Sequence, residues 1–306
     1  MVMADLRVSF AGVEFENPIL VASGTFGFGR EYGEFFDLNE LGGICVKGLT
    51  LHPRAGNKTP RIAETPMGML NSVGLQNPGV DAFIAEELPF LRQYRTKVIA
   101  NLSGNTVEEY AILAEKLSDA GVDLLEVNIS CPNVKEGGLA FGTSTQGAAE
   151  VTRAVRAKSK VPVMVKLSPN VSDIASIAKA CEAEGADALS LINTLLGMRI
   201  DTQTKKPILH NNMGGLSGPA ILPVAIRMVY QVAGAVDIPI LGMGGVMTAS
   251  DAVEMMIAGA SLIALGTALF IDPLAPIKVK RELSAYLDQR NIKSVTELIG
   301  TVKVHV

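Results

Sequence analysis

Short runs of apolar residues recur along the chain, and each is followed by small or polar residues. Apolar runs of this length are typical of strands that are buried on both faces of a parallel sheet. Several of them are separated by stretches with helical spacing of apolar residues, at 107–120, 172–184 and 220–233, which we expect to form crossover helices. The runs cover residues 19–22, 43–46, 98–102, 122–129, 161–167, 186–192, 238–241 and 261–265. Eight strands close a (β/α)8 barrel, so the pattern predicts an α/β TIM barrel.

The start of the chain carries a different pattern, in which apolar and polar residues alternate. Within residues 6–15, Val8 and Phe10 stand opposite Val13 and Phe15 across the pair Ala11-Gly12. Alternation on both sides of a short turn that contains glycine is typical of a β-hairpin. We expect this N-terminal β-hairpin to cap the bottom of the barrel.

Length and composition are those of one barrel. The chain has 306 residues and contains no low-complexity tract, charge run or Ser- and Pro-rich stretch that would act as a linker. We therefore expect a single domain over residues 1–306. Hydrophobic residues make up 48% and charged residues 19%, which favours a parallel sheet covered by helices over an antiparallel sheet with a solvated face.

Charge and aromatic content argue against nucleic acid as a partner. The net charge is -4 and the pI is near 5.5, so the chain has no basic field for a phosphodiester backbone. It contains no Trp and only 5% aromatic residues, which leaves few rings on which bases could stack.

The cysteines indicate a reducing compartment. Cys45, Cys131 and Cys181 are odd in number and widely spaced, without a CxxC pair, so we expect neither a disulfide framework nor a metal site. The first residues lack a basic region followed by an apolar core, so no signal peptide is expected. These features predict a cytoplasmic protein.

One long uncharged stretch, residues 255–271, invites a membrane interpretation. Glycine and hydroxyl side chains interrupt it, and a membrane-spanning helix needs about 20 apolar residues. We interpret the stretch as the end of a helix followed by a buried strand, and we expect no membrane contact.

The carboxyl ends of the expected strands are unusually polar for such an apolar chain. In a barrel of this type those ends line the active site. They carry Ser23 and Gly24, Lys47 and Gly48, Asn101, Asn128 and Cys131, Lys166, and Asn193 and Thr194.

The last two expected strands end in glycine-rich turns, at residues 242–245 and 266–267. Turns without Cβ atoms allow backbone N–H groups to converge on a phosphate, and barrels often bind phosphate after strands seven and eight. The alternative is a pair of ordinary tight turns; two of them on adjacent strands favour a phosphate site.

Lys47 and Lys166 each follow an apolar strand, a position where lysine is rarely buried without a role. They could reach solvent along the surface. Alternatively, one could form a Schiff base, as in an aldolase. A third possibility is that they act as fixed cations near a reduced flavin or a carboxylate. Because the strand ends carry amides and no acidic residue, the third interpretation fits best.

Cys131 lies in the sequence Asn-Ile-Ser-Cys-Pro-Asn at residues 128–133, between two asparagines. A lone cysteine is often only a small buried hydrophobe. Here the amides could grip a polar heterocycle while the thiolate accepts a proton from carbon. The following residues, 132–146, contain several glycines and have the permissive backbone of a lid.

These segments together resemble the dihydroorotate dehydrogenase family. The resemblance rests on residues 128–133 and on Met-Leu-Asn-Ser-Val-Gly-Leu-Gln-Asn-Pro-Gly (69–79), Val-Lys-Leu-Ser-Pro-Asn (165–170), Gly-Gly-Leu-Ser-Gly-Pro-Ala (214–220) and Gly-Met-Gly-Gly-Val (242–246). It runs in order from the hairpin to about residue 290. Met-Val-Tyr-Gln-Val (228–232) resembles the NAD-dependent class in particular.

The resemblance implies oxidation of dihydroorotate to orotate in pyrimidine biosynthesis, with one FMN per chain. In the NAD-dependent class the FMN barrel pairs with an electron-transfer subunit that carries FAD and a [2Fe-2S] cluster. We therefore expect two catalytic and two partner subunits, with a dimer of catalytic subunits at the centre. The quinone-linked membrane class uses serine as its base and has an amino-terminal membrane segment, neither of which is seen in this sequence.

The resemblance also implies a role for individual residues. Cys131 would be the catalytic base that removes the C5 proton of dihydroorotate. The residues implied to hold the substrate are Lys47, Asn71, Ser72, Val73, Gly74, Leu75, Asn128, Asn133, Asn193 and Thr194. Those implied to bind FMN are Ser23, Lys47, Gly48, Asn101, Asn128, Lys166, Ile192, Gly218, Gly244, Gly245, Gly266 and Thr267.

Three alternatives stay open. The fumarate-linked homodimeric class of the same enzyme shares the cysteine and almost every site residue. A non-redox phosphate-binding barrel, such as a lyase with Lys166 as Schiff base, belongs to a different class, and so does a non-catalytic scaffold.

Overall fold

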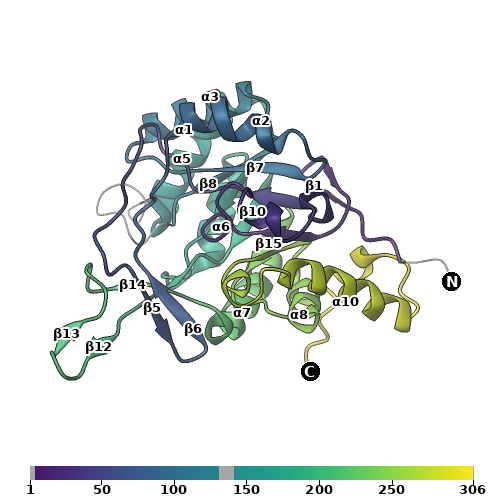
Figure 1. Ribbon diagram of the computed structural model, residues 1–306. Helices are drawn as coiled ribbons and strands as arrows, with labels where there is room; N and C mark the ends of the chain where they lie inside the picture. The colour runs from purple at the N-terminus through teal and green to yellow at the C-terminus, as the bar shows by residue number, and fades with distance from the viewer. Residues whose placement is uncertain (1–3, 131–140, 306) are drawn as a thin grey trace.

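The computed structural model describes residues 4–130 and 141–305, and its central feature is a closed barrel of parallel strands (Figure 1). The strands follow one another around the barrel in chain order, and the last pairs with the first through Ile263 and Ile19. Their bounds are β3 Ile19–Val21, β4 Gly43–Cys45, β7 Lys97–Leu102, β8 Leu124–Asn128, β9 Val163–Lys166, β10 Ala188–Leu191, β15 Ile240–Met243 and β16 Leu262–Leu265. Each overlaps one of the eight apolar runs, although β15 extends two residues beyond the run at 238–241, so the predicted barrel is confirmed.

The barrel strands are buried on both faces, which explains why their sequences do not alternate. Every residue of β3, β4, β8, β9, β10, β15 and β16 is buried. One face of each strand packs in the barrel interior and the other against the surrounding helices.

The expected crossover helices are present. Helix α3 (Val107–Asp119) begins after Thr106, whose hydroxyl accepts a 3.3 Å hydrogen bond from the backbone N–H of Glu109. The other long helices are α5 Thr145–Lys158, α6 Ile174–Ala183, α7 Leu222–Ala233, α8 Ala249–Ala258 and α10 Ala275–Gln289. Three of these six lie in the stretches at 107–120, 172–184 and 220–233, as the helical spacing predicts.

The uncharged stretch at 255–271 divides between helix and strand. It contains the end of α8, all of β16 and the short helix α9 (Ala268–Ile271). None of the helices in the described ranges is both long and apolar enough to cross a membrane.

The N-terminal hairpin forms with the expected facing pairs. Strands β1 (Val8–Phe10) and β2 (Val13–Phe15) are antiparallel, with Val8 opposite Phe15 and Phe10 opposite Val13. The ring of Phe15 lies against Gly43, the first residue of β4, because a Cβ atom there would come within 3.1 Å of that ring. The hairpin therefore packs at the amino-terminal ends of the barrel strands, the bottom of the barrel.

A second, antiparallel sheet is added to the barrel, at the lower left in Figure 1. Its order is β11-β14-β6-β5, and β14 pairs with β6 through Gly215 and Asn71. The strands are β5 Ile62–Thr65, β6 Gly68–Asn71, β11 Leu195–Gly197 and β14 Gly214–Ser217. Two of them come from the connection after β4 and two from the connection after β10, and the sequence pattern did not predict them.

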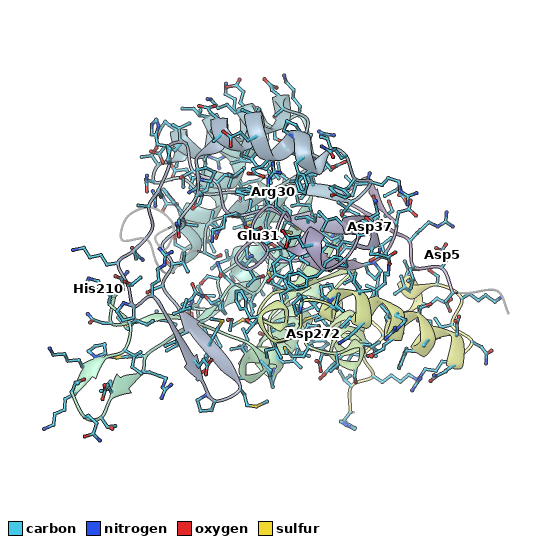
Figure 2. All side chains as sticks on the ribbon, in the orientation of Figure 1. Asp5, Arg30, Glu31, Asp37, His210 and Asp272 are labelled. Atoms are coloured by element: carbon cyan, nitrogen blue, oxygen red, sulfur yellow. The ribbon has the colours of Figure 1, made fainter. Side chains whose placement is uncertain are left out.

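The remaining elements are short. They are the two-stranded ribbon β12 Ile200–Asp201 and β13 Lys206–Pro207, the helical turns α1 Val80–Ala82, η3 Phe83–Glu87 and α2 Leu88–Leu91, and the 3-10 turns η1 Tyr32–Glu34, η2 Leu38–Glu40, η4 Pro219–Ile221 and η5 Val295–Leu298. Asp272, labelled in Figure 2, directly follows α9 and forms a 2.6 Å ion pair with Lys278. Such exposed pairs contribute at most about 1 kcal/mol to stability.

Candidate active site

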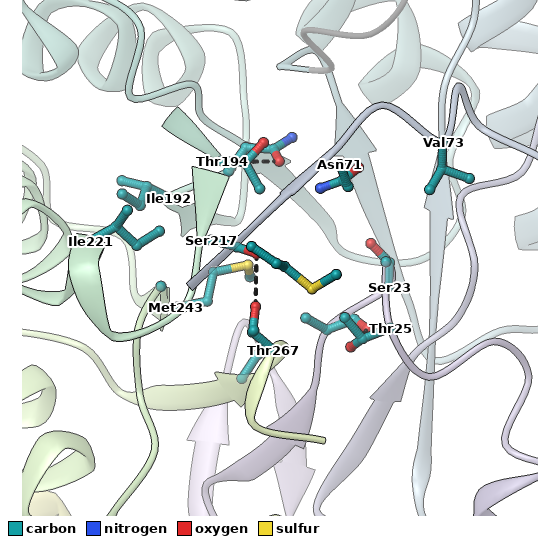
Figure 3. Close-up of a pocket in the computed structure, with 18 of the residues that line it drawn as sticks. Ser23, Thr25, Asn71, Val73, Ile192, Thr194, Ser217, Ile221, Met243 and Thr267 are labelled. Carbon is teal, nitrogen blue, oxygen red and sulfur yellow. Dashed lines mark hydrogen bonds between the residues drawn. The ribbon is translucent and has the colours of Figure 1, made fainter. Parts of the chain in front are cut away.

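A cavity of about 410 Å³ opens where the barrel strands end, and strand ends from around the barrel line it (Figure 3). The added sheet forms another wall, through Met69 and Asn71 of β6 and Ser217 of β14. No Asp or Glu is found among the described residues that line the cavity. Its polar groups are therefore amides, hydroxyls, backbone groups and two lysines, a set suited to anionic ligands.

Almost all of the residues singled out in the sequence meet at this cavity. Those that line it are Ser23, Lys47, Gly48, Asn71, Val73, Gly74, Leu75, Asn101, Asn128, Lys166, Ile192, Asn193, Thr194, Gly218, Gly244, Gly245, Gly266 and Thr267. Ser72 does not line it: its side chain is fully buried behind the wall, and its backbone N–H donates to the carbonyl oxygen of Arg61 at 2.7 Å. Cys131 and Asn133 lie outside the described residues.

The glycine-rich turns present unpaired backbone donors to the cavity. The backbone N–H groups of these turns that have no acceptor in the described part of the chain are those of Gly244, Gly245, Gly266 and Thr267. Gly245 has a φ of +83°, and a Cβ atom on it would lie 2.7 Å from the backbone nitrogen of Leu222. Only glycine lets the chain pass this close to the residue where α7 begins, and the result is a cradle for an anion.

A hydrogen bond joins one end of this cradle to the added sheet. The hydroxyl of Thr267 donates to the hydroxyl of Ser217 at 2.8 Å, which links the turn after β16 to β14 (Figure 3). Sequence reasoning gave Ser217 no role, although it directly precedes Gly218 in a quoted segment. Gly24, which the sequence placed at the end of the first strand, also lines the cavity. The other lining residues that sequence reasoning missed are Ala22, Thr25, Ile62, Met69, Ile221, Met243, Val246, Met247, Ala264, Ala268 and Phe270. Most of these are apolar and carry no chemical signal in the sequence.

Lys166 and Lys47 both reach the cavity, from the ends of β9 and β4. The side chain of Lys166 is 6% exposed, and its Nζ lies 3.7 Å from Oε2 of Glu126. Glu126 is completely buried within β8, inside the barrel. Sequence reasoning missed this carboxylate because it sits within an apolar run and not at a strand end.

The nitrogen and the oxygen of the Asn101 side-chain amide differ in their hydrogen bonding. Its Nδ2 donates a 2.5 Å hydrogen bond to Oε2 of Glu126. Its Oδ1 is buried and has no partner among the described residues. A Cβ atom on Gly48 would lie 2.9 Å from this oxygen, so only glycine fits beside it at this point of the cavity lining.

A set of hydrogen bonds holds the amides after β8 and β10. The side-chain nitrogen of Asn193 donates to the hydroxyl of Ser130 at 2.8 Å, and that hydroxyl donates to Oδ1 of Asn128 at 3.1 Å. The backbone N–H of Thr194 donates to Oδ1 of Asn193 at 2.8 Å. These bonds fix the side chain of Asn193 beside the residues that precede Cys131.

Two of the cysteines are buried thiols away from the cavity wall. Burial raises the pKa of the Cys45 thiol well above its usual value, and the nearby carboxylate of Glu126 raises it further. Burial also raises the pKa of Cys181, in α6, to about 12. Both thiols therefore stay protonated at neutral pH and are poor candidates for a base or nucleophile.

The cavity residues fit FMN, the cofactor implied by the resemblance. The cradle at the two glycine turns suits a phosphate group. The buried Oδ1 of Asn101 requires a donor, which the N–H group of an isoalloxazine ring can supply. The ammonium of Lys166 suits a ring edge that becomes negatively charged on reduction.

Comparisons with known proteins agree with this chemistry. A family model described as Dihydroorotate dehydrogenase matches residues 5–287. The catalytic subunit of dihydroorotate dehydrogenase B (NAD(+)) from Alkaliphilus metalliredigens (strain QYMF) is 60% identical over 302 residues, which cover 99% of this chain and 100% of that protein. Proteins of the same name are similar in Alkaliphilus oremlandii (strain OhILAs), at 58% over 300 residues covering 98% and 99%, and in Geotalea uraniireducens (strain Rf4), at 56% over 299 residues covering 97% and 98%.

Proposed function

The chain belongs to the dihydroorotate dehydrogenase family, and we propose that it oxidises dihydroorotate to orotate in pyrimidine biosynthesis, with NAD as the final acceptor. The whole chain would act as a single FMN-binding domain. The observation that carries the proposal is a cavity that brings together an anion cradle, two lysines and several amides, without an Asp or Glu among its described lining residues. Both FMN and dihydroorotate are anions, and such a cavity suits them.

The reaction removes a proton from C5 of dihydroorotate and a hydride from C6. Bound FMN would supply the chemistry of the hydride acceptor. Cys131 would be the base for the C5 proton; it follows β8 in the sequence, and Asn128, the last residue of β8, lines the cavity. Ser130, which precedes it in the sequence, is held by hydrogen bonds to Asn128 and Asn193.

The substrate would lie between the barrel and the added sheet. Lys47 would pair with its carboxylate, and the amides would bond its polar ring atoms without adding charge. The residues that would surround it are Asn71, Ser72, Val73, Gly74, Leu75, Asn128, Asn133, Asn193 and Thr194. Of these, Ser72 would contact the substrate through its backbone or would support the cavity wall from behind, since its side chain does not line the cavity.

FMN would occupy the barrel side of the cavity. Gly244, Gly245, Gly266 and Thr267 would donate backbone hydrogen bonds to its phosphate. Lys166 would face the ring edge where negative charge arrives. The remaining residues that would contact it are Ser23, Lys47, Gly48, Asn101, Asn128, Ile192 and Gly218.

Electrons would leave through a partner subunit. The relatives are named catalytic subunits of an NAD-dependent enzyme, and this chain has no dinucleotide fingerprint of its own. We infer a partner that carries FAD and a [2Fe-2S] cluster, in an assembly of two catalytic and two partner subunits with the catalytic dimer at its centre. We place this assembly in the cytoplasm.

The ion pair inside the barrel argues against a Schiff-base lyase. A lysine that forms an imine must attack as a neutral amine. Lys166 instead forms a buried ion pair with Glu126, 3.7 Å from its Nζ, which is the contact of a fixed cation.

Two measurements test the function. The purified chain should contain one FMN, and dihydroorotate should bleach the flavin spectrum under anaerobic conditions; a colourless protein without flavin would contradict the proposal and favour the lyase. Turnover with NAD and with fumarate should then be measured on the chain alone and co-expressed with the partner. Efficient fumarate reduction by the chain alone, with no NAD activity conferred by the partner, would assign it to the fumarate-linked class.

A further inference from the structure

Glu126 is a completely buried carboxylate in the interior of the barrel, below the cavity that it does not itself line. It lies in β8 and meets side chains from the three strands β7, β9 and β10. A charge buried in this position lowers the stability of the fold unless it is paired and hydrogen-bonded, so the presence of Glu126 needs a physical explanation.

All of the polar partners of Glu126 are donors. The hydroxyl of Ser190 donates to Oε1 at 2.8 Å. Oε2 accepts from Asn101 at 2.5 Å and lies 3.7 Å from the Lys166 ammonium. An ionised carboxylate accepts only, so this environment suits the charged form. Among the ion pairs in ranges 4–130 and 141–305, this is the one whose two side chains are both buried.

Two of these partners reach the cavity, and Glu126 determines what they present to it. The amide of Asn101 has a donor end and an acceptor end. Because the carboxylate can only accept, the donor end of Asn101 must face Glu126, and this leaves Oδ1 unbonded and beside Gly48 in the cavity wall. The carboxylate thus orients the Asn101 amide so that its oxygen, a hydrogen-bond acceptor, is at this point of the cavity wall.

Lys166 is held in the same way. Its Nζ has an ion pair with Glu126 and, within the described ranges, no hydrogen-bond acceptor. The carboxylate attracts the ammonium from below, while the N–H groups remain available on the cavity side. The negative charge of Glu126 also offsets part of the positive charge that a ligand in the cavity experiences.

We propose that Glu126 is a positioning residue of the flavin site, which turns Asn101 Oδ1 and the Lys166 ammonium toward the flavin and limits how strongly Lys166 attracts negative charge on it. The inference rests on the proposed function for the identity of the ligand. Glu126 touches neither substrate nor flavin, and its effect passes through its two neighbours.

The test is Glu126→Gln in the FMN-loaded enzyme, with sulfite as the probe. Sulfite adds to N5 of an oxidised flavin and leaves negative charge on the pyrimidine ring, so its affinity reports the attraction of the site for that charge. Glutamine keeps the volume; its oxygen can accept from Asn101 and its amide can donate to the oxygen of Ser190. The charge alone is removed. The dissociation constant for sulfite should fall roughly ten- to a hundredfold, the size of effect expected for one charge about 6 to 12 Å away at an effective dielectric of about 20.

Ser190→Ala is the matched control, because it removes one hydrogen bond to the carboxylate and leaves its charge. It should keep sulfite affinity within about twofold of the wild type while costing stability of the order of one hydrogen bond. If Glu126→Gln left sulfite affinity unchanged or weakened it, or if both variants shifted it equally, Glu126 would be only a structural residue. Wild-type protein that contained no flavin would instead overturn the proposed function, and the two failures are thereby distinguished.

A second variant keeps the inference testable if Glu126→Gln folds poorly. In that case the cause would be an unpaired buried lysine, and removing both charges in Glu126→Gln/Lys166→Met should restore the free energy of unfolding. A double variant no better than Glu126→Gln would show that the carboxylate is needed for packing and not for its charge on Lys166.

Discussion

The phenol of Tyr110, in α3, donates a 2.8 Å hydrogen bond to the backbone carbonyl oxygen of Asn128, the last residue of β8. Both residues are buried. The bond ties a crossover helix to the strand end that precedes Cys131. Tyr110→Phe should lower the free energy of unfolding by about 1 kcal/mol, the net worth of one hydrogen bond, and should slow flavin reduction by dihydroorotate several-fold.

Urea unfolding and anaerobic stopped-flow reduction measure these two effects. Ser103→Ala is the control, because the Ser103 hydroxyl contacts the same carbonyl oxygen at the longer distance of 3.4 Å and its loss should have a smaller effect. Equal effects of the two variants on the reduction rate would show that the Tyr110 bond has no special role.

Replacing Cys131 tests the proposed base. Cys131→Ser should fold and bind FMN, yet reduce its flavin with dihydroorotate about 10² to 10⁴ times more slowly at neutral pH, because a hydroxyl is a poorer proton acceptor than a thiolate. Cys45→Ser is a useful comparison, since that thiol is completely buried and does not line the cavity. An unchanged reduction rate in Cys131→Ser would make Cys131 a packing residue.

Replacing Lys166 tests the proposed cation. Lys166→Ala should lower the reduction potential of bound flavin more than it weakens dihydroorotate binding, because the cation matters most when negative charge reaches the ring. It also leaves Glu126 buried without its ion pair, so stability should fall. Lys166→Arg keeps the charge and should retain most of the potential. An unchanged potential with a large rise in KM would place Lys166 on the substrate instead.

The glycine turn after β15 should tolerate no side chain. Gly245→Ala places a Cβ atom 2.7 Å from the backbone nitrogen of Leu222, and FMN retention after gel filtration should fall at least about tenfold. Gly12→Ala is the matched control: its φ of +78° is similar, but nothing lies within 4 Å of the added atom. It should cost about 1 kcal/mol of stability and leave FMN bound. Equal FMN loss in both variants would argue against the cradle.

The buried thiol of Cys181 should make the protein sensitive to alkali. Its pKa is raised to about 12 in the fold, so the fold favours the protonated thiol. This contribution is complete below the unfolded pKa of about 8.5 and is lost as pH rises toward 12, at about 1.4 kcal/mol per pH unit. Cys181→Ala should remove that share of the slope in unfolding free energy above pH 9. Parallel pH profiles for the two proteins would contradict it.

Much of the fold was predictable because it depends on local pattern. The runs at 98–102 and 161–167 identify β7 and β9 because both faces of a barrel strand are buried. The rule that strand ends line the site then brought Lys47, Asn101 and Lys166 to one cavity from sequence alone. These residues were found because polar side chains directly follow apolar runs.

The rest depends on contacts that no local pattern records. The strands of the added sheet are only three or four residues long, and β6 meets β14 across more than 140 residues of sequence, through Asn71 and Gly215. The role of Glu126 could not be predicted for the same reason. Its partners Lys166 and Ser190 lie on other strands, so nothing nearby in the sequence shows that its charge is compensated. The roles of Cys131 and Asn133 remain predictions from sequence.

The added sheet divides the site into parts of different structural origin. The groups proposed for FMN stand mainly on barrel strands and their turns, whereas Asn71 to Leu75 come from an excursion that leaves the barrel after β4. Loops of this kind accept insertions and replacements far more readily than barrel strands do. The proposed FMN-binding groups of the barrel can therefore stay constant while the substrate-binding connections change. Chains with the same barrel can then oxidise different ring compounds by exchanging the connections after β4 and β10.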